Sequence, residues 1–261
     1  MQRPTNRQRR GFTLIELFAA LSILAILAGV LLPAVQQTRE LSRRVSCANR
    51  LKQQSLALLA FESTYKHLPA GAEPQTLHAW SSRILPFLEQ ANRYHQIDFQ
   101  IGWNSGSNRR AIHSSLPVYK CPSSWKDYPG ASDYSGIRGS SHNARSNLGR
   151  NGVLFPILSK TNGIRLSEIT DGTSQTLAIA EAVALGEDSN GFWASGLNCI
   201  GHDEGPINNR RGSRDEIASL HPGGANVALA DGSTRFLNQS LSLQVLGALC
   251  TRGNGEVTGS Y

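Results

Sequence analysis

One continuous apolar segment near the N-terminus constrains the chain more than any other feature. Residues 12–35 read FTLIELFAALSILAILAGVLLPAV, and Glu16 is the only charged residue in this segment of 24. A helix of that length crosses a hydrocarbon core of about 30 Å. The segment therefore predicts a transmembrane helix.

A basic stretch precedes the apolar segment. Residues 1–11 read MQRPTNRQRRG and contain four arginines and no acidic residue. A basic stretch followed by an apolar one also describes a secretory signal peptide. Two features argue against that alternative: no small-residue A-x-A site closes the apolar segment, and Glu16 lies near its start.

The junction between these two stretches resembles a type IV prepilin signal, in the run RGFTLIEL at residues 10–17. The resemblance implies that a prepilin peptidase cleaves between Gly11 and Phe12 on the cytoplasmic side, and that Phe12 is then N-methylated. It also gives Glu16 an assembly role, pairing with the free amine of a neighbouring subunit. A carboxylate at bilayer depth costs about 2.5–3.5 kcal/mol and needs such a partner, unless it lies close to the interface.

The helix is expected to continue beyond the membrane as a stem. Residues 36–65 contain good helix formers, and the sequence His67-Leu68-Pro69-Ala70-Gly71 should end the helix. From Phe12 to Tyr65 a continuous helix would be about 80 Å long, kinked or loosened at Pro33. One face should pack on a sheet; its apolar members are Leu41, Val45, Ala48, Leu51, Leu58, Phe61 and Tyr65.

The remaining residues, 67–261, predict a loop-rich β head. Apolar runs at 153–158, 176–184 and 191–194 indicate strands, whereas residues 102–151 are rich in Ser, Gly and Asn and are typical of loops. A helix is expected to begin at about Pro86.

The clearest local signal is a β-hairpin near the C-terminus. Asp231-Gly232 between two apolar runs favours a two-residue type I′ turn. That turn would place Leu229 opposite Thr234 and Val227 opposite Phe236, on a face that should cover the stem helix.

A second resemblance extends over nearly the whole chain, from about residue 10 to 257. Nine residues separate His221 from Asp231-Gly232, and this spacing is similar to the H-X9-DG element of a bacterial prepilin-like family, the domain of unknown function 1559. Other runs that agree with this family are PAVQQ at 33–37, CANRLKQ at 47–53, LPFLEQ at 85–90, CPS at 121–123, DGTS at 171–174 and HPGGAN at 221–226. The resemblance implies a membrane-anchored protein with an extracytoplasmic head, but no established biochemical role.

Catalytic chemistry is not indicated. A strand between His221 and Asp231 would separate them by about 20 Å, so loop and turn roles are favoured over a shared proton or metal. The common nucleotide, zinc-protease and hydrolase motifs are absent from the sequence. We therefore expect no enzyme activity, no cofactor and no metal; calcium binding by the acidic pairs of the later head is unsupported.

Four cysteines follow the apolar segment without C-x-x-C spacing, which argues against a zinc site. Disulfides are permitted if that side of the membrane is oxidising, and four cysteines allow three connectivities. A Cys47–Cys121 disulfide that ties the stem to the head is favoured over its rivals; the alternative is four buried thiols. The four tryptophans are expected in the core rather than in a carbohydrate-binding platform.

The net charge of +7 first suggests nucleic-acid binding. Removal of the four leader arginines leaves 22 basic and 19 acidic residues, a net charge of +3. Much of that excess lies just past the membrane, at Arg39, Arg43, Arg44, Arg50 and Lys52, where it suits lipid headgroups or neighbouring subunits. The charge thus indicates targeting and a membrane-proximal collar, and no nucleic-acid partner.

Together these features predict an α+β protein of the pilin-like lollipop type, in which a long N-terminal stem helix packs on a loop-rich antiparallel β head. The expected parts are a leader at 1–11, a transmembrane half at 12–35, an extracytoplasmic stem at 36–66 and a head at 67–261. The chain should be a single-pass inner-membrane protein with a cytoplasmic N-terminus. Its expected partners are the prepilin peptidase and pilin-like subunits. Two alternatives remain: a monomeric tethered binding module, and an anchored enzyme that uses His221 and Asp231.

Overall fold

The computed structural model describes residues 13–141, 150–157, 163–184, 191–202, 205–209 and 215–255. The predicted leader and cleavage site, through Phe12, lie outside the described residues. The chain divides into two compact units, residues 1–42 and residues 43–261, which are described separately.

A single helix, α1 (Leu14–Tyr65), runs through the end of the first unit into the second. Its first turn forms a capping box: the N–H and the hydroxyl of Thr13 donate to Glu16 Oε2 at 2.9 and 2.8 Å, and the N–H of Glu16 donates to Thr13 Oγ1 at 3.4 Å. Pro33 lies inside α1 without ending it. The predicted end of the helix at Tyr65 is confirmed.

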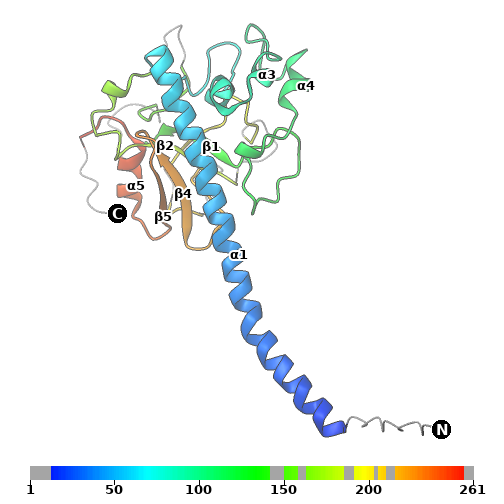
Figure 1. The fold of residues 1–261 in the computed structure, drawn as a ribbon. Helices are drawn as coiled ribbons and strands as arrows, with labels where there is room; N and C mark the ends of the chain where they lie inside the picture. The colour runs from blue at the N-terminus through cyan, green and yellow to red at the C-terminus, as the bar shows by residue number, and fades with distance from the viewer. Residues whose placement is uncertain are drawn as a thin grey trace, which may run out of the picture. The chain divides into compact units, whose positions relative to one another are not determined.

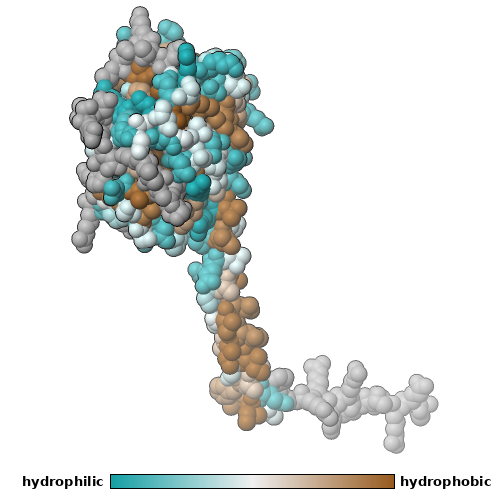
Figure 2. Space-filling view, turned by 90° about the vertical axis from the view of Figure 1, so that its left-hand side faces the viewer, coloured by the Kyte–Doolittle hydropathy of each residue, from teal (hydrophilic) through white to brown (hydrophobic). Residues whose placement is uncertain are grey.

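The first unit is an apolar helix with exposed side chains. Among the described residues, α1 is the one helix long and apolar enough to cross a membrane, and none of its most apolar window is buried. Its large side chains are exposed, from Val35 at 46% to Ile15 at 76%. In Figure 2 this unit's surface is coloured hydrophobic over most of its length.

In the second unit, α1 buries one face. Cys47, Leu51, Leu58 and Phe61 are buried there, together with the polar Gln54, whose side-chain N–H donates to the carbonyl of Val118 at 2.8 Å. The predicted face was wrong at its two ends within this unit, because the side chains of Val45 and Tyr65 are 51% and 53% exposed.

The head is built on a five-stranded sheet in the order β3-β1-β2-β4-β5. The strands are β1 (Tyr134–Gly139), β2 (Leu177–Glu181), β3 (Cys199–Gly201), β4 (Gly224–Leu229) and β5 (Thr234–Asn238). The α+β class is confirmed, but the sheet is mixed rather than antiparallel, since β1 and β3 pair in parallel. The predicted hairpin is confirmed as β4 and β5, and β2 lies within the expected run at 176–184. In contrast, β1 lies in the stretch interpreted as loops, and the described parts of 153–158 and 191–194 form isolated bridges only.

Each face of the sheet has its own cover. Leu51 and Leu58 of α1 share a buried cluster with Ala228 and Ala230. The opposite face carries Val227 and Leu229, in a second cluster with the C-terminal helix α5 (Leu243–Cys250). Figure 1 shows α1 and α5 beside this sheet.

The hairpin between β4 and β5 has a different register from the predicted one. Ala228 pairs with Thr234 and Val227 pairs with Arg235, one residue away from the type I′ expectation. The N–H of Gly232 donates to Leu229 O at 3.0 Å, and Gly232 has a φ of +84°, so a type I turn with a left-handed glycine closes a three-residue loop. The expected covering face is also wrong, because Ala228 and Ala230 pack with α1, whereas Val227 and Leu229 pack with α5.

Short helices complete the head: α2 (Trp80–Arg83), α3 (Ala91–Tyr94), α4 (Asn108–Ile112), and the 3₁₀ turns η1 (Leu85–Leu88), η2 (Pro117–Tyr119) and η3 (Leu166–Glu168). The helix expected from Pro86 is thus two short turns. Trp80 and Trp193 are fully buried, as predicted for core residues, whereas Trp125 is 72% exposed.

Candidate functional site

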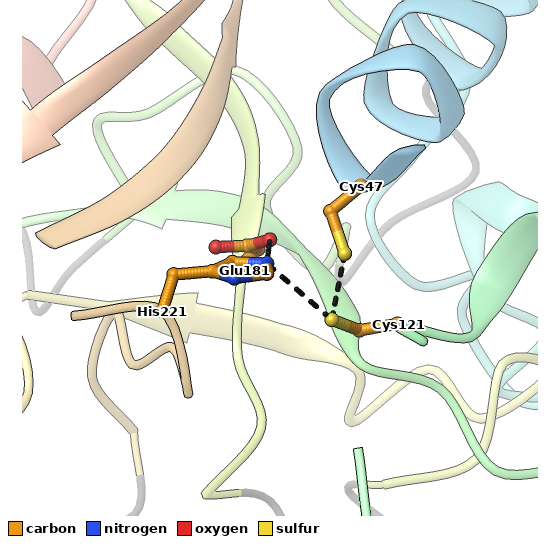
Figure 3. A group of neighbouring side chains, drawn as sticks. All are labelled: Cys47, Cys121, Glu181 and His221. Atoms are coloured by element: carbon orange, nitrogen blue, oxygen red, sulfur yellow. Dashed lines mark hydrogen bonds and ion pairs between the residues drawn. The ribbon is translucent and has the colours of Figure 1, made fainter. Parts of the chain in front are cut away.

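Four buried side chains meet in the head, drawn from four separate parts of the chain (Figure 3). Cys47 lies on α1, Cys121 follows the η2 turn, Glu181 ends β2, and His221 lies in the loop before β4. Their exposed fractions are 0%, 3%, 0% and 1%. We refer to these four residues as the Cys-Cys-His-Glu cluster.

The potential ligand atoms of this cluster all lie within 4.8 Å of one another. The two sulfurs, Cys47 Sγ and Cys121 Sγ, are 2.6 Å apart. Cys121 Sγ lies 3.6 Å from His221 Nε2, and the same nitrogen lies 3.4 Å from Glu181 Oε1. The four side chains therefore point toward a common centre.

A buried aspartate fixes the position of Cys121. Asp133 Oδ2 accepts the N–H of Cys121 at 2.7 Å, and its Oδ1 accepts the hydroxyl of Ser124 at 2.7 Å. The ammonium group of Lys126 lies 3.5 Å from Asp133 Oδ1 and compensates its charge. This network holds the Cys121 loop against β1, where Asp133 immediately precedes the strand.

Glu181 and His221 are also held in place. Both carboxylate oxygens of Glu181 accept hydrogen bonds from Asn226 on β4, the N–H at 2.8 Å and the side-chain amide at 3.0 Å. The backbone N–H of His221 donates to Ser219 Oγ at 3.1 Å. The geometry of the cluster is therefore supported by a second layer of polar contacts.

The two thiols of the cluster differ in acidity. The hydrogen bond with Cys47 lowers the pKa of Cys121 to about 6, against the opposing effect of burial and with a further contribution from His221. The same hydrogen bond and burial raise the pKa of Cys47 far above its ordinary value. Nearby, burial lowers the pKa of Lys126 to about 8, although Asp133 opposes the shift.

The cluster does not have the geometry of a catalytic triad. In a triad, the nucleophile and the carboxylate contact opposite nitrogens of the imidazole, so that one nitrogen accepts the nucleophile's proton while the carboxylate orients the ring through the other. Here Cys121 and Glu181 both approach Nε2, and the cluster is buried from substrate. The arrangement instead suits a disulfide between the two sulfurs or the coordination of a metal ion. The predicted Cys47–Cys121 bond stays a prediction, and the structure supplies the proximity that it needs.

The residues of the H-X9-DG element lie in different surroundings. His221 is part of the cluster, whereas the exposed Asp231 accepts the N–H and the hydroxyl of Ser233 at 2.8 and 2.7 Å within the hairpin turn. The Gly232 carbonyl accepts from Lys52 Nζ at 2.7 Å and Ser55 Oγ at 3.2 Å, so this turn docks on α1. The turn role predicted for Asp231-Gly232 is thus observed, with a stem contact that the sequence did not reveal.

Glu181 is the cluster residue that sequence reasoning missed. The available signal was one charged residue at the end of the otherwise apolar run LAIAE. The pairing of Cys47 with Cys121 is favoured by the sequence analysis, and the run at His221 agrees with the family resemblance, but nothing in their spacing predicts that His221 joins the two cysteines.

Some residues of the membrane-proximal basic collar (Arg39, Arg43, Arg44, Arg50 and Lys52) contact the head. The guanidinium of Arg44 lies 3.2 Å from the ring centroid of Phe236. Arg50 donates to the Lys120 carbonyl, and Lys52 donates to the Gly232 carbonyl. Three of the five collar residues therefore contact the head, which weakens the interpretation of the collar as a lipid-binding surface.

A cavity of about 570 Å³ opens beside the C-terminal end of α1. Aromatic and charged side chains line it, among them Phe61, Tyr65, Arg83, Tyr94 and Phe99. Arg83 forms an ion pair with Glu73, and its guanidinium carbon lies 3.8 Å from the Phe99 ring centroid. The guanidinium of Arg83 is thus held in a fixed position among the aromatic rings that line the cavity.

The acidic pairs of the later head, for which calcium binding was unsupported, are Glu187-Asp188, Asp203-Glu204 and Asp215-Glu216. The first two pairs lie outside the described residues, as do Gly11 and Phe12. Asp215 of the third pair is described and forms an ion pair with Arg138.

Comparison with known families gives two matches. The family described as a protein of unknown function (DUF1559) matches residues 36–201 and 187–244. The prokaryotic N-terminal methylation motif matches residues 6–32. No curated protein and no solved structure matches the chain.

Proposed function

The chain belongs to the DUF1559 family, and we propose that it is a prepilin-like structural protein that assembles through its apolar helix. The N-terminal methylation motif indicates a type IV pilin-like precursor that is processed by a prepilin peptidase and associated with a membrane. Our proposal adds that cleavage follows Gly11, that Phe12 becomes the methylated N-terminus, and that pseudopilin-type subunits pack side by side.

The main support for this proposal is the position at which α1 begins relative to the methylation motif. The methylation motif spans residues 6–32, and α1 begins within it at Leu14, directly after the residues of the proposed cleavage site. The Thr13–Glu16 capping box then places the one acidic side chain of the apolar segment at the helix start. There it would be close to the new N-terminal amine of an adjacent subunit.

The exposed apolar surface of α1 in the first unit is the surface that we propose for membrane anchoring and assembly. The helix in the first unit buries none of its most apolar window against the rest of the chain. In a membrane that surface can contact lipid or equivalent helices of neighbouring subunits. We propose a single-pass inner-membrane protein with a cytoplasmic N-terminus and an extracytoplasmic head. The methylation motif supports this orientation, because the leader that precedes the cleavage site of such precursors is cytoplasmic.

Mass spectrometry of the mature N-terminus tests the processing step. Coexpression with an active prepilin peptidase should give a chain that begins with N-methylated Phe12. Gly11→Val should block cleavage because a side chain then occupies the scissile position. Gly29→Val is the matched control, since no atom lies within 4 Å of a Cβ added there. An intact Met1 in the wild-type chain would contradict the proposal.

Assembly is tested separately, by cross-linking in membranes. The wild-type chain should give a ladder of oligomers, and Glu16→Ala should shorten the ladder while leaving cleavage intact. Glu62→Ala, at a half-buried position near the C-terminal end of the same helix, is the control. A cleaved wild-type chain that remains monomeric would exclude assembly.

A tethered binding module is the second candidate, and the 570 Å³ cavity supports it. Aromatic rings around an ion-paired arginine are suited to a ligand that has both planar apolar and anionic parts. The monomeric outcome of the cross-linking experiment would favour this candidate.

We also propose that the chain is not an enzyme. His221 is buried in the cluster, and Asp231 holds a turn at the surface. These positions offer no shared substrate site for the pair that sequence reasoning had considered.

A further inference from the structure

We propose that the Cys-Cys-His-Glu cluster binds one Zn²⁺ ion, which joins the stem helix to the sheet of the head. The donor set consists of two cysteine sulfurs, one imidazole nitrogen and one carboxylate oxygen. Zinc is bound in proteins by these ligands, with four protein ligands in structural sites. The proposal goes beyond the role in assembly and does not depend on it.

Two of the distances already match a tetrahedral site. Zinc–ligand bonds of normal length place a sulfur and a nitrogen ligand about 3.6 Å apart, and a nitrogen and an oxygen ligand about 3.4 Å apart. The structure has Cys121 Sγ at 3.6 Å from His221 Nε2, and this nitrogen at 3.4 Å from Glu181 Oε1. The remaining pair, Cys121 Sγ and the Glu181 carboxylate oxygen, lies within 4.8 Å, so the three atoms can occupy three corners of a metal site.

The fourth corner requires one adjustment. Two sulfurs bound to one zinc ion lie about 3.8 Å apart, so Cys47 and Cys121 must separate from their 2.6 Å contact. A disulfide requires the opposite movement, to about 2.05 Å. The difference between the two outcomes lies in the other residues: a disulfide uses neither His221 nor Glu181, whereas a zinc ion uses all four.

The charge at the cluster also favours a cation. The carboxylate of Glu181 is fully buried, and the hydrogen bonds that it accepts come from the neutral Asn226. A buried carboxylate is costly without a positive partner. The nearby ammonium group of Lys126 contacts Asp133 instead. The imidazole of His221 also contacts Glu181 and supplies a positive charge only when it is protonated. A divalent ion bound to neutral His221 would provide that positive charge instead.

The supporting contacts are those that a metal site needs. Asn226 orients Glu181, and Asp133 anchors the backbone of Cys121. Such outer contacts fix ligand orientation and raise metal affinity. Because each ligand comes from a different segment, the site exists only in the folded head, and bound zinc would stabilise that fold.

Elemental analysis of the full chain, purified in detergent with metal-free buffers, tests the proposal directly. About one zinc ion per chain is expected. Cys121→Ser and His221→Gln should lower this content at least tenfold, whereas Cys199→Ser should retain it, because Cys199 is a buried cysteine outside the cluster. Circular dichroism identifies any variant that fails to fold.

Cobalt gives a readout that does not rely on variants. The chain, reduced with a non-thiol reductant and stripped of metal, should bind one Co²⁺ and develop thiolate-to-cobalt charge-transfer absorption, which stoichiometric Zn²⁺ abolishes. Zinc-free chains whose mass is about 2 Da low, with a cross-linked Cys47–Cys121 peptide, would overturn the proposal in favour of the disulfide. Reduced wild-type chains that bind neither metal would overturn it as well.

Discussion

The two parts of α1 use apolar residues in opposite ways. Up to Ser42, in the first unit, large apolar side chains are exposed around the helix, whereas the part within the second unit buries one face against the sheet. A helix that is apolar all round requires a membrane or other helices, while a one-sided helix needs only a neighbouring sheet. One continuous helix therefore has two environments along its length. The pattern of apolar residues, rather than the backbone, determines which part is exposed on all sides and which part packs on the sheet.

The largest expected effect is on the stability of the head, and it should differ between the two parts of α1. Leu51→Ala should lower the free energy of unfolding of the head by about 2–5 kcal/mol, because Leu51 is fully buried between α1 and the sheet. Denaturation followed by tryptophan fluorescence reports the head alone, since all four tryptophans lie between residues 80 and 193. Leu24→Ala in the apolar part and the half-exposed Leu56→Ala should each change this value by less than about 0.5 kcal/mol. Equal losses at Leu24 and Leu51 would remove the distinction.

Membrane insertion should show the reverse sensitivity. Leu24→Arg should lower the favourable insertion free energy by about 3 kcal/mol, because it places a guanidinium in the apolar segment. The fraction of newly made chains that integrate into membrane vesicles measures this shift. Leu56→Arg, at a half-exposed position of the second part, should insert as the wild-type chain does. A comparable defect at Leu56 would mean that the membrane-spanning segment extends further than we infer.

Glycines provide a third contrast. Gly232→Ala should cost the head about 1–3 kcal/mol, since Gly232 has a φ of +84° and an added Cβ would lie 2.8 Å from Leu59 Cδ1 on α1. Gly172→Ala separates the two causes, because its φ is +96° but no atom lies within 4 Å. Gly29→Ala in the apolar part should leave head stability unchanged. Urea denaturation of the three variants gives the comparison, and a neutral Gly232→Ala would show that the hairpin turn does not set the docking of α1.

Sequence reasoning succeeded where the signal is local and failed where it depends on distant contacts. The apolar segment, the helix end at Tyr65 and the Asp231-Gly232 turn were predictable from residue type and periodicity. The strand β1 was missed because SGIRG at 135–139 is rich in small residues, and its burial comes from β2 and β3 on either side. The hairpin register shifted by one because a type I turn with a left-handed Gly232 competes with type I′ for the same Asp-Gly pair.

The Cys-Cys-His-Glu cluster could not be found in the same way. Its members lie at least 40 positions apart, and only pairing of β1, β2 and β4 brings three of the segments together. The available signal was a single glutamate at the end of an apolar strand. This signal is not specific, because many strands end in a charged residue that lies at the surface. The apolar segment at 12–35, by contrast, can be recognised from the sequence without any knowledge of tertiary contacts.

The smallest expected effect concerns alkaline pH, to which the head should respond through its buried thiols. Burial raises the pKa of Cys199 well above its ordinary value, so the folded state keeps the proton that the unfolded state loses above about pH 8.5. The stability that Cys199 contributes is therefore complete below that pH and declines as the pH rises. Cys199→Ala should reduce the alkaline loss of unfolding free energy by about 1 kcal/mol between pH 8 and 9.5, as measured by urea denaturation at each pH. Leu56→Ala, which removes no titrating group, should retain the wild-type pH dependence. An unchanged slope in Cys199→Ala would mean that Cys199 titrates alike in both states, and that its environment in the head is more hydrated than its 6% exposure indicates.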